Sequence, residues 1–299
     1  MKILAKIENY EKGIIIERLN RFVVKGKIKN KPILAHLNNT GRLEDFLKKG
    51  RVGLFLPIEN KLKFRLSMIK ESKNIYSIID TQLQMKCFEI ALEKGYISWL
   101  KGAKILKRNF RINNSNLPGY KPDIAPGFRT DVSGKHQGNL SGKHQSKISI
   151  IDYLIERKNK KYLIEVKSAV MKYKNFAMYP DCPSVRGQKH IKELINIQST
   201  RITDRINYPN KEPNKNLKFG QDSGKTFGHN SGRYFPIILF IAGMKNISAF
   251  SPNKNADPKI YELLKIAKNK GVKIKAIQIY FDEKRKSVIL ENDDLPVIL

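Results

Sequence analysis

Residues 148–170 read ISIIDYLIERKNKKYLIEVKSAV, and this stretch decides how the C-terminal half of the chain folds. Two β-like runs, residues 148–155 and 162–170, flank a short polar segment. A hairpin is the simplest connection between two such runs. If Lys158 and Asn159 form its two-residue tip, residues whose numbers add up to 317 face each other across the strands. Asp152 and Glu165 are one such pair.

This pairing predicts a small acidic site. Directly opposed side chains have Cβ atoms about 4.5–5.5 Å apart, so the carboxylates of Asp152 and Glu165 are expected to reach one cation. Strand alternation places Lys167 on the same face as Glu165, about 6.6 Å further along. Mg²⁺ or Mn²⁺ would remove the repulsion between the carboxylates and hold water for attack on phosphorus, and Lys167 would position that water or offset phosphate charge. The alternative is a solvated edge hairpin in which these residues form an ordinary ion pair.

A possible phosphate-binding helix follows the hairpin. Ser184 is suited to cap a helix with an apolar stripe, and its first turn carries polar and basic side chains: Arg186, Gln188, Lys189 and His190. The N–H groups of a helix N-terminus favour phosphate, so we expect Arg186, Gln188 and Lys189 to contact nucleic acid. A polar first turn also occurs on ordinary surface helices, and His190 is equally suited to packing.

The first 80 residues contain short strand-like runs separated by turns, with one brief helix expected over residues 43–47. Apolar and basic side chains alternate over residues 61–68, which predicts a strand with its basic face towards solvent. Several short strands favour a small barrel, and the OB-like barrel is the natural candidate. Helical spacing begins at Thr81, which places a domain boundary near residues 72–80.

The C-terminal segment predicts a β-α-β unit. Residues 236–242 form an apolar run typical of a buried strand, and Asp257 with Pro258 suits the start of a helix. Gly271 suits the end of that helix, and residues 272–276 alternate as a strand does. The two strands are expected to be parallel and joined by a right-handed crossover. The C-terminal half is therefore predicted to be α/β.

Two polar segments, residues 113–147 and 203–233, interrupt this pattern and are predicted to be flexible insertions. The first contains the five-residue sequence SGKHQ twice, at residues 133–137 and 141–145. His136 and His144 are candidate metal ligands, but a loop of this composition offers no fixed geometry for a metal.

The composition indicates a basic globular protein. Lys and Arg total 58 against 27 acidic residues, a formal net charge of +31. Such an excess attracts polyanions, and nucleic acid is the partner that it favours, ahead of membrane surfaces and acidic partners. The two cysteines are too few for a disulfide framework, and the longest apolar run is about half the ~20 residues of a membrane span. We therefore expect a cytoplasmic protein without membrane contact.

Four short motifs together resemble the sugar fermentation stimulation protein family. They are RLNRF at residues 18–22, NTGRL at 39–43, IEVKS at 164–168 and RGQKH at 186–190. The resemblance implies an OB-like barrel over residues 1–75, followed over residues 76–299 by an α/β domain of the PD-(D/E)XK nuclease-like fold with a mixed sheet. It also implies non-specific DNA binding and a regulatory role in sugar (maltose) metabolism.

The resemblance also assigns roles to residues. Asp152 corresponds to the motif aspartate, and Glu165 with Lys167 corresponds to the E-x-K pair. Family members usually carry an arginine two residues before the motif aspartate, where this chain has Ile150. The role of that arginine is therefore absent or supplied elsewhere. Glu89, on the helix before the core, is suggested as an additional acid.

The N-terminal motifs carry Arg18, Arg21 and Arg42, which the resemblance implies as phosphate contacts. We expect a non-specific DNA-binding protein with a regulatory function, in which the acidic site is vestigial or structural. The alternative is a Mg²⁺- or Mn²⁺-dependent nuclease that uses the acidic site. A third possibility is an interaction protein whose positive charge serves another polyanion.

Overall fold

The computed structural model describes residues 1–113, 148–207 and 234–299. Most of both predicted insertions, including His136 and His144, lies outside the described residues. Residues 203–207 were expected to belong to the second insertion, but they form the last turns of helix α2 (Val185–Asn207). No helix in the described part of the chain is long and apolar enough to cross a membrane.

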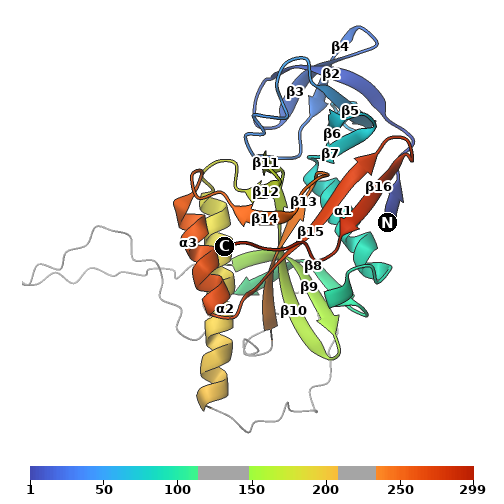
Figure 1. Ribbon diagram of the computed structural model, residues 1–299. Coiled ribbons are helices and arrows are strands. Elements are labelled where there is room, and N and C mark those ends of the chain that lie inside the picture. The colour runs from blue at the N-terminus through green and yellow to red at the C-terminus, as the bar shows by residue number, and fades with distance from the viewer. Residues whose placement is uncertain (114–147, 208–233) are drawn as a thin grey trace, which may run out of the picture.

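Five N-terminal strands form a closed barrel (Figure 1), in agreement with the small barrel that the sequence predicts. They are β2 (Glu11–Arg18), β3 (Val23–Ile28), β4 (Lys31–His36), β5 (Val52–Pro57) and β6 (Phe64–Ser72). Antiparallel pairing runs in the order β4-β3-β2-β5-β6, and a parallel pairing of β4 with β6 closes the ring. A Cβ on Gly13 or Gly26 would lie 2.9 Å from the Phe55 ring, so the small barrel interior requires glycine at both positions.

Two local predictions in the barrel are wrong. Residues 43–47 form turns instead of a brief helix, although the apolar side chains of this segment are buried as expected. The strand predicted over residues 61–68 begins only at Phe64, and Arg65 is only partly exposed, although Lys61 and Lys63 are exposed as expected. The guanidinium of Arg65 lies 2.7 Å from the carboxylate of Asp80. A tertiary ion pair thus turns a residue of the expected basic face inwards.

Most of the remaining strands form a mixed sheet that is continuous with the barrel. The order is β7 (Ile75–Ile78), β15 (Lys273–Asp282), β13 (Tyr234–Ala242), β10 (Lys160–Ala169), β9 (Ile148–Arg157) and β8 (Lys104–Asn113). The pairs β10–β13 and β13–β15 are parallel, and the other pairs in this order are antiparallel. Strand β7 pairs with both β6 of the barrel and β15. The predicted division between residues 75 and 76 stays a prediction.

The other strands pair at the edge of the mixed sheet or form a separate small sheet. Strand β1 (Lys2–Lys6) pairs with β16 (Ser287–Asn292), which pairs with β15, so the first residues of the chain join the mixed sheet. A separate sheet contains β11 (Met171–Tyr173), β12 (Phe176–Tyr179) and β14 (Ala249–Pro252). It lies between the barrel and helix α3 (Pro258–Asn269) (Figure 1).

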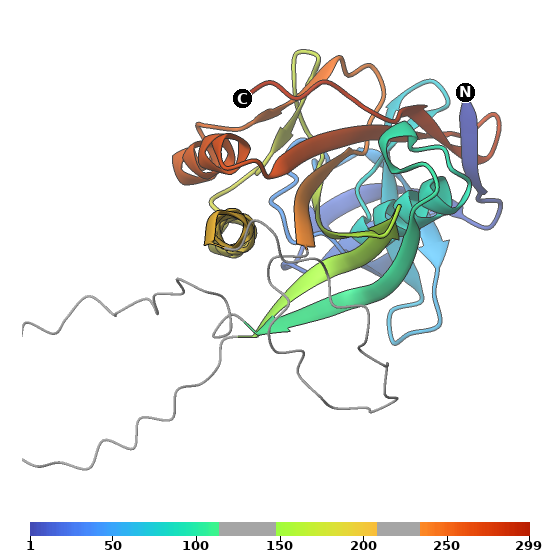
Figure 2. The same ribbon diagram turned by 90° about the horizontal axis from the view of Figure 1, so that it is seen from below.

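Helices cover both faces of the mixed sheet (Figures 1 and 2). Helix α1 (Thr81–Glu93) buries Leu83, Cys87, Phe88 and Ala91 in one apolar layer. Helices α2 and α3 bury their apolar stripes in the other layer. The unit β13-α3-β15 is the predicted β-α-β unit, with parallel strands and with the Asp257 side chain accepting the Ile260 N–H at 3.0 Å.

Strand β10 shows how the two layers divide the side chains. Tyr162 and Ile164 belong to the α1 layer, whereas Leu163 belongs to the α2 and α3 layer. Because side chains alternate along a strand, Glu165 and Lys167 follow Leu163 onto the α2 side. This face is the one that opens towards the barrel.

Candidate functional site

The hairpin has the predicted register. Strands β9 and β10 pair antiparallel from Lys160–Arg157 to Ile164–Tyr153, and each pair of numbers adds up to 317. Lys158 and Asn159 occupy the tip with positive φ values of 48° and 58°, as a two-residue type I′ turn requires. The tip therefore fixes which residues of the two strands meet.

Asp152 lies just beyond the last regular pair. Its Oδ2 accepts a hydrogen bond of 2.8 Å from the N–H of Val166, so the side chain replaces a main-chain acceptor where the strands separate. Burial, followed by the negative charge of Glu165, raises the pKa of Asp152 to about 6. Two neighbouring carboxylates in a poorly solvated site therefore repel each other near neutral pH.

Glu165 is the most buried member of the site, with 2% of its surface exposed. Its Oε1 accepts from Lys167 Nζ at 2.5 Å and contacts Nδ1 of His190. Burial alone would raise the pKa of Glu165, but Lys167 and His190 outweigh burial and hold this pKa below its ordinary value. Its Oε2 is buried and has no hydrogen-bond partner within the described residues. A buried carboxylate oxygen without a partner is costly unless a cation or donor occupies the site.

Lys167 keeps its proton in this environment. Burial would lower the pKa of its ammonium, but the attraction of Glu165 dominates and raises that pKa. The ammonium also lies 3.4 Å from Nδ1 of His190. Lys167 therefore stands beside Glu165 as a charged donor.

His190 is a site residue that the sequence left undecided between phosphate binding and packing. It is buried on α2, and its ring closes the cluster around Glu165 from a position 25 residues further along the chain. The polar first turn and the RGQKH motif pointed to this segment but not to its contact with Glu165, because that contact depends on how α2 packs on the sheet.

The residues predicted on the first turn of α2 point in different directions. The hydroxyl of Ser184 accepts the Gly187 N–H at 3.1 Å and caps the helix as expected. Arg186 is exposed and lines the cleft described below. Gln188 instead donates to both carboxylate oxygens of Asp257 at 3.1 Å, and Lys189 lies 3.6 Å from Glu193. Nucleic-acid contacts by Gln188 and Lys189 stay predictions, and the geometry gives Gln188 a role in joining α2 to α3.

Arg18 organises the barrel loops. Its guanidinium donates to four main-chain carbonyl groups, those of Asn20 at 3.0 Å, Arg21 at 3.1 Å, Gly41 at 2.6 Å and Arg42 at 2.6 Å. These main-chain contacts engage the guanidinium donors. The phosphate contact expected of Arg18 stays a prediction. Arg21 and Arg42 are the outward arginines of these loops, and the exposed Arg42 lies 3.5 Å from Glu44.

A cleft of about 840 Å³ joins the barrel to the acidic site. Its barrel wall contains Arg21, Phe22 and residues 38–41, and its other walls contain Asp152, residues 165–168 and residues 178–187. The arginine-bearing turn and the buried carboxylates therefore open into the same space. Sequence spacing alone does not bring these two segments together.

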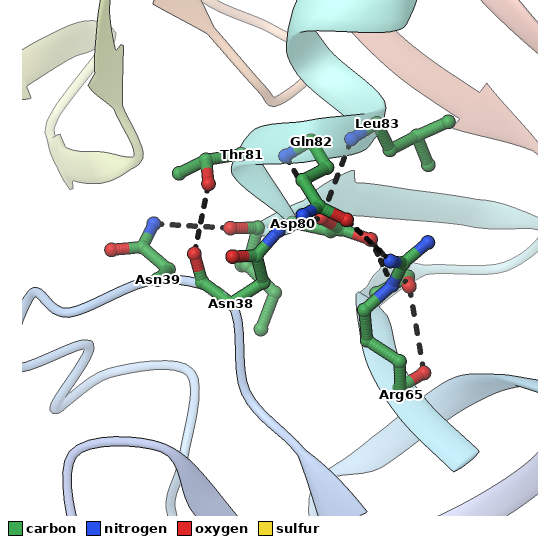
Figure 3. A network of polar contacts seen from close by, with 9 residues as sticks. Asn38, Asn39, Arg65, Asp80, Thr81, Gln82 and Leu83 are labelled. Atoms are coloured by element: carbon green, nitrogen blue, oxygen red, sulfur yellow. Dashed lines mark hydrogen bonds and ion pairs between the residues drawn. The ribbon is translucent and has the colours of Figure 1, made fainter. Parts of the chain in front are cut away.

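A polar network centred on Asp80 fixes the loop that forms this wall (Figure 3). The buried Asp80 accepts from Asn38 at 3.1 Å and from Ser67 at 2.9 Å, and it caps α1. Asn39 donates to the Ile79 carbonyl at 3.0 Å. The signal that would have identified Asp80 is its position directly before the helical pattern, where an N-cap residue is expected.

Glu89 does not belong to the site, so its assignment as an additional acid is wrong. Its carboxylate receives two hydrogen bonds from Arg108, at 2.7 and 2.8 Å, and one of 3.0 Å from the hydroxyl of Tyr153. Tyr153 lies in the α1 layer, on the face of the sheet opposite the Glu165 cluster.

Ile150 stands where family members usually carry an arginine, and the adjacent strand carries an arginine opposite this position. In the β8–β9 pairing Arg111 stands directly opposite Ile150. Directly opposed side chains lie on the same side of their strands, and both residues are exposed. Strand β8 therefore offers a guanidinium beside the position where an arginine was expected.

Asp152 and Glu165 are the side chains that could hold a cation here. The described residues contain no group of three or more His, Cys, Asp and Glu side chains arranged around a metal position. Mg²⁺ commonly binds through one or two carboxylates while its other ligands are water and substrate phosphate. The pair, with its buried unpartnered oxygen, fits such a cation.

Comparison with known proteins agrees with the fold. The model of the "SfsA N-terminal OB domain" matches residues 16–78, and that of the "Sugar fermentation stimulation protein RE domain" matches residues 130–207 and 229–285. Sugar fermentation stimulation protein homologues of Pyrococcus furiosus and Archaeoglobus fulgidus are 34% and 33% identical, covering 90% and 99% of this chain and 88% and 99% of theirs.

A solved structure, that of Pyrococcus furiosus SfsA in complex with Ca²⁺, superposes with a TM-score of 0.74 at 32% identity. The similarity covers 100% of both chains. The family models, the relatives and the structure agree over both the barrel and the mixed sheet. The chain belongs to the sugar fermentation stimulation protein family.

Proposed function

We propose that this protein binds DNA in the cleft and hydrolyses its phosphodiester bonds with a divalent cation held by Asp152 and Glu165. The observation that carries this proposal is the Glu165 Oε2 atom, which is buried and unpartnered near a second, partly buried carboxylate, that of Asp152. Within the described residues Glu193 Oε2 is also buried without a hydrogen-bond partner, but Glu193 does not line the cleft, whereas Glu165 lines it together with Asp152.

The donor set suits Mg²⁺ or Mn²⁺, because both ions prefer oxygen ligands and accept a partly open site. The Ca²⁺ complex of the Pyrococcus furiosus relative supports a divalent cation in this family. When bound, such a cation would activate water and neutralise charge on the phosphate.

Other residues of the cleft would contact the water molecule and the DNA. Lys167, held protonated by Glu165, offers its ammonium to a water molecule or a phosphate oxygen. His190 contacts the same Glu165 oxygen as Lys167 and leaves the other oxygen available. Arg21 and Arg186 stand exposed at the cleft and would hold the phosphates on either side of the scissile bond.

A second candidate is DNA binding without cleavage, in a regulatory role connected with sugar (maltose) use. The name of the family favours it, since the relatives are described by their effect on sugar fermentation. In this case the acidic site would be vestigial or structural. Both candidates share the net charge of +31 and therefore DNA binding dominated by phosphates.

Cleavage separates the two candidates. Plasmid and single-stranded DNA are incubated with Mg²⁺ or Mn²⁺ and the wild type, the Glu165→Gln variant or the Glu89→Gln variant. The proposal expects cleavage by the wild type and Glu89→Gln, and none by Glu165→Gln or in EDTA. Equal cleavage by all three proteins would identify a contaminating nuclease and remove the proposal.

Binding is tested separately through salt. If six or more phosphates are contacted, DNA affinity falls on the order of a thousandfold between 50 and 200 mM salt. An affinity that does not change over this range would contradict binding dominated by phosphates, and with it the proposal that DNA is the partner.

A further inference from the structure

An aromatic side chain stands exposed on the barrel wall of the cleft. Phe22 lies between β2 and β3, exposes 52% of its surface and lines the same cleft as the acidic site. Large apolar side chains gain stability by burial, so packing alone gives no reason for an outward aromatic ring at this position.

The backbone holds Phe22 firmly in this exposed position. Its N–H donates to the side chain of Asn20 at 2.8 Å, and its carbonyl accepts from the Leu37 N–H at 2.7 Å. Arg18 binds the carbonyl groups of Asn20 and Arg21 on the same turn. A ring presented by a pre-ordered turn loses little conformational freedom when a ligand stacks on it.

The shape of the cleft selects among nucleic acids. Its volume of about 840 Å³ lies within the roughly 300–1,000 Å³ of sites that enclose compact ligands. Of the two carboxylates that line it, Glu165 is buried and Asp152 is partly buried. A duplex is a rigid rod whose bases are stacked inside, whereas a single strand can bend into a recess and present its base faces.

Cations stand where the phosphates of such a strand would pass. Arg21 is adjacent to Phe22, and Arg186 lies at the start of α2 in the opposite wall of the cleft. Both side chains are exposed, and no ion-pair partner faces either of them within the described residues. An aromatic platform flanked by basic side chains is the usual arrangement for binding single strands.

We infer that the cleft takes single-stranded DNA, with one base stacked on Phe22 and the neighbouring phosphates held by Arg21 and Arg186. This inference rests on the proposed function, because it names the form of DNA that reaches Asp152 and Glu165. The barrel thereby selects the strand, and the acidic site acts on the phosphate that follows the stacked base.

Fluorescence anisotropy in EDTA tests this selection without cleavage. The probes are a labelled single-stranded oligonucleotide, the matched duplex and an RNA strand of the same sequence. Phe22→Ala is expected to weaken single-strand binding roughly 5- to 150-fold, the usual effect of losing one stacked base. Duplex binding is expected to change by less than about twofold, and Phe22→Trp to restore single-strand affinity. Leu34→Ala, which alters an exposed apolar barrel residue that does not line the cleft, is the control and leaves both affinities unchanged.

The outcomes separate this inference from the proposed hydrolysis. Equal loss of single-strand and duplex affinity in Phe22→Ala, or no loss in either, would overturn the inference and leave cleavage assays unaffected. Phe22-dependent single-strand binding without cleavage in Mg²⁺ or Mn²⁺ would support the inference and remove the hydrolysis. Tighter, Phe22-dependent binding of the RNA strand would overturn the choice of DNA.

Discussion

A glutamate carboxylate lies at each face of the β9–β10 hairpin, Glu165 of β10 at one and Glu89 of α1 at the other, and the two differ in how their oxygens are satisfied. On the α2 face, Glu165 is buried with Lys167 and His190, and one of its oxygens has no partner. On the α1 face, Glu89 meets the guanidinium of Arg108 and the hydroxyl of Tyr153, with its carboxylate fully engaged.

The difference arises from adjacent residues of one strand. Asp152 and Tyr153 are neighbours in β9, and strand alternation sends them to opposite faces. One face therefore collects two carboxylates in a recess, whereas the other pairs a single carboxylate with an exposed arginine. Of these two sites, the candidate reactive one is the site where two carboxylates meet and a buried carboxylate oxygen has no hydrogen-bond partner.

The largest expected effect is on catalysis. Glu165→Gln removes the negative charge that holds a cation, and because such a cation stabilises the transition state by several kcal/mol, cleavage should fall about a thousandfold. Glu89→Gln, on the other face, should retain cleavage within about threefold. Initial rates on a fluorescent DNA substrate measure both. Comparable losses of cleavage in the two variants would contradict the view that Glu165, and not Glu89, belongs to the reactive site.

Stability should show the next largest effect. Lys167→Met leaves the buried Glu165 charge without its main partner, which costs about 3 kcal/mol. Arg108→Met breaks a pair whose arginine is largely exposed, and such pairs are worth at most about 1 kcal/mol. Urea unfolding of both variants beside the wild type gives the two differences. If Arg108→Met were the more destabilised protein, the buried Lys167–Glu165 pair would not be the costlier of the two to break.

A smaller effect is expected from His190, which we interpret as a positioning residue for Glu165. Loss of a residue that orients a ligand typically lowers metal affinity 10- to 100-fold, so His190→Ala should weaken Mn²⁺ binding in calorimetry by this factor. His190→Gln should recover part of the affinity, because it keeps a polar contact. Tyr153→Phe is the matched control on the other face, and a similar loss there would remove the positioning role.

The smallest effect concerns pH. Hydrogen bonding from Arg108 holds the pKa of Glu89 below its ordinary value, despite the opposing effect of burial. Because the folded-state pKa is lowered, the contribution of this pair is present above the ordinary pKa of a glutamate and is lost as pH falls through the folded-state value. The difference in Tm between wild type and Glu89→Gln should therefore shrink from pH 7 to pH 3. A difference that grows on acidification would contradict the pairing.

Local chemistry made part of the fold and site predictable. The Lys158-Asn159 tip determined the register that brings Asp152 near Glu165, and Asp257 with Pro258 determined where α3 begins. These features depend on a few consecutive residues and on strand or helix periodicity. Predictions of this kind needed no knowledge of tertiary packing.

The remainder depended on contacts between distant segments. The inward turn of Arg65 requires Asp80, the role of Gln188 requires Asp257, and His190 reaches Glu165 only because α2 packs on the sheet. The shared cleft likewise requires the barrel loops to meet the end of β10. Periodicity within one segment carries no information about such partners, so the sequence located the acidic pair but not its surroundings.

The most direct test of the central claim, that Asp152 and Glu165 share a divalent cation, is a thermal unfolding titration with Mn²⁺ or Ca²⁺. Binding to the native state at a hundred times the Kd adds about 2.7 kcal/mol, which corresponds to an increase in Tm of about 4 °C for a chain of this size. The account predicts this increase for the wild type and for Glu89→Gln, and its loss in Asp152→Asn and Glu165→Gln. An equal increase in all four proteins, or no increase in the wild type, would contradict it.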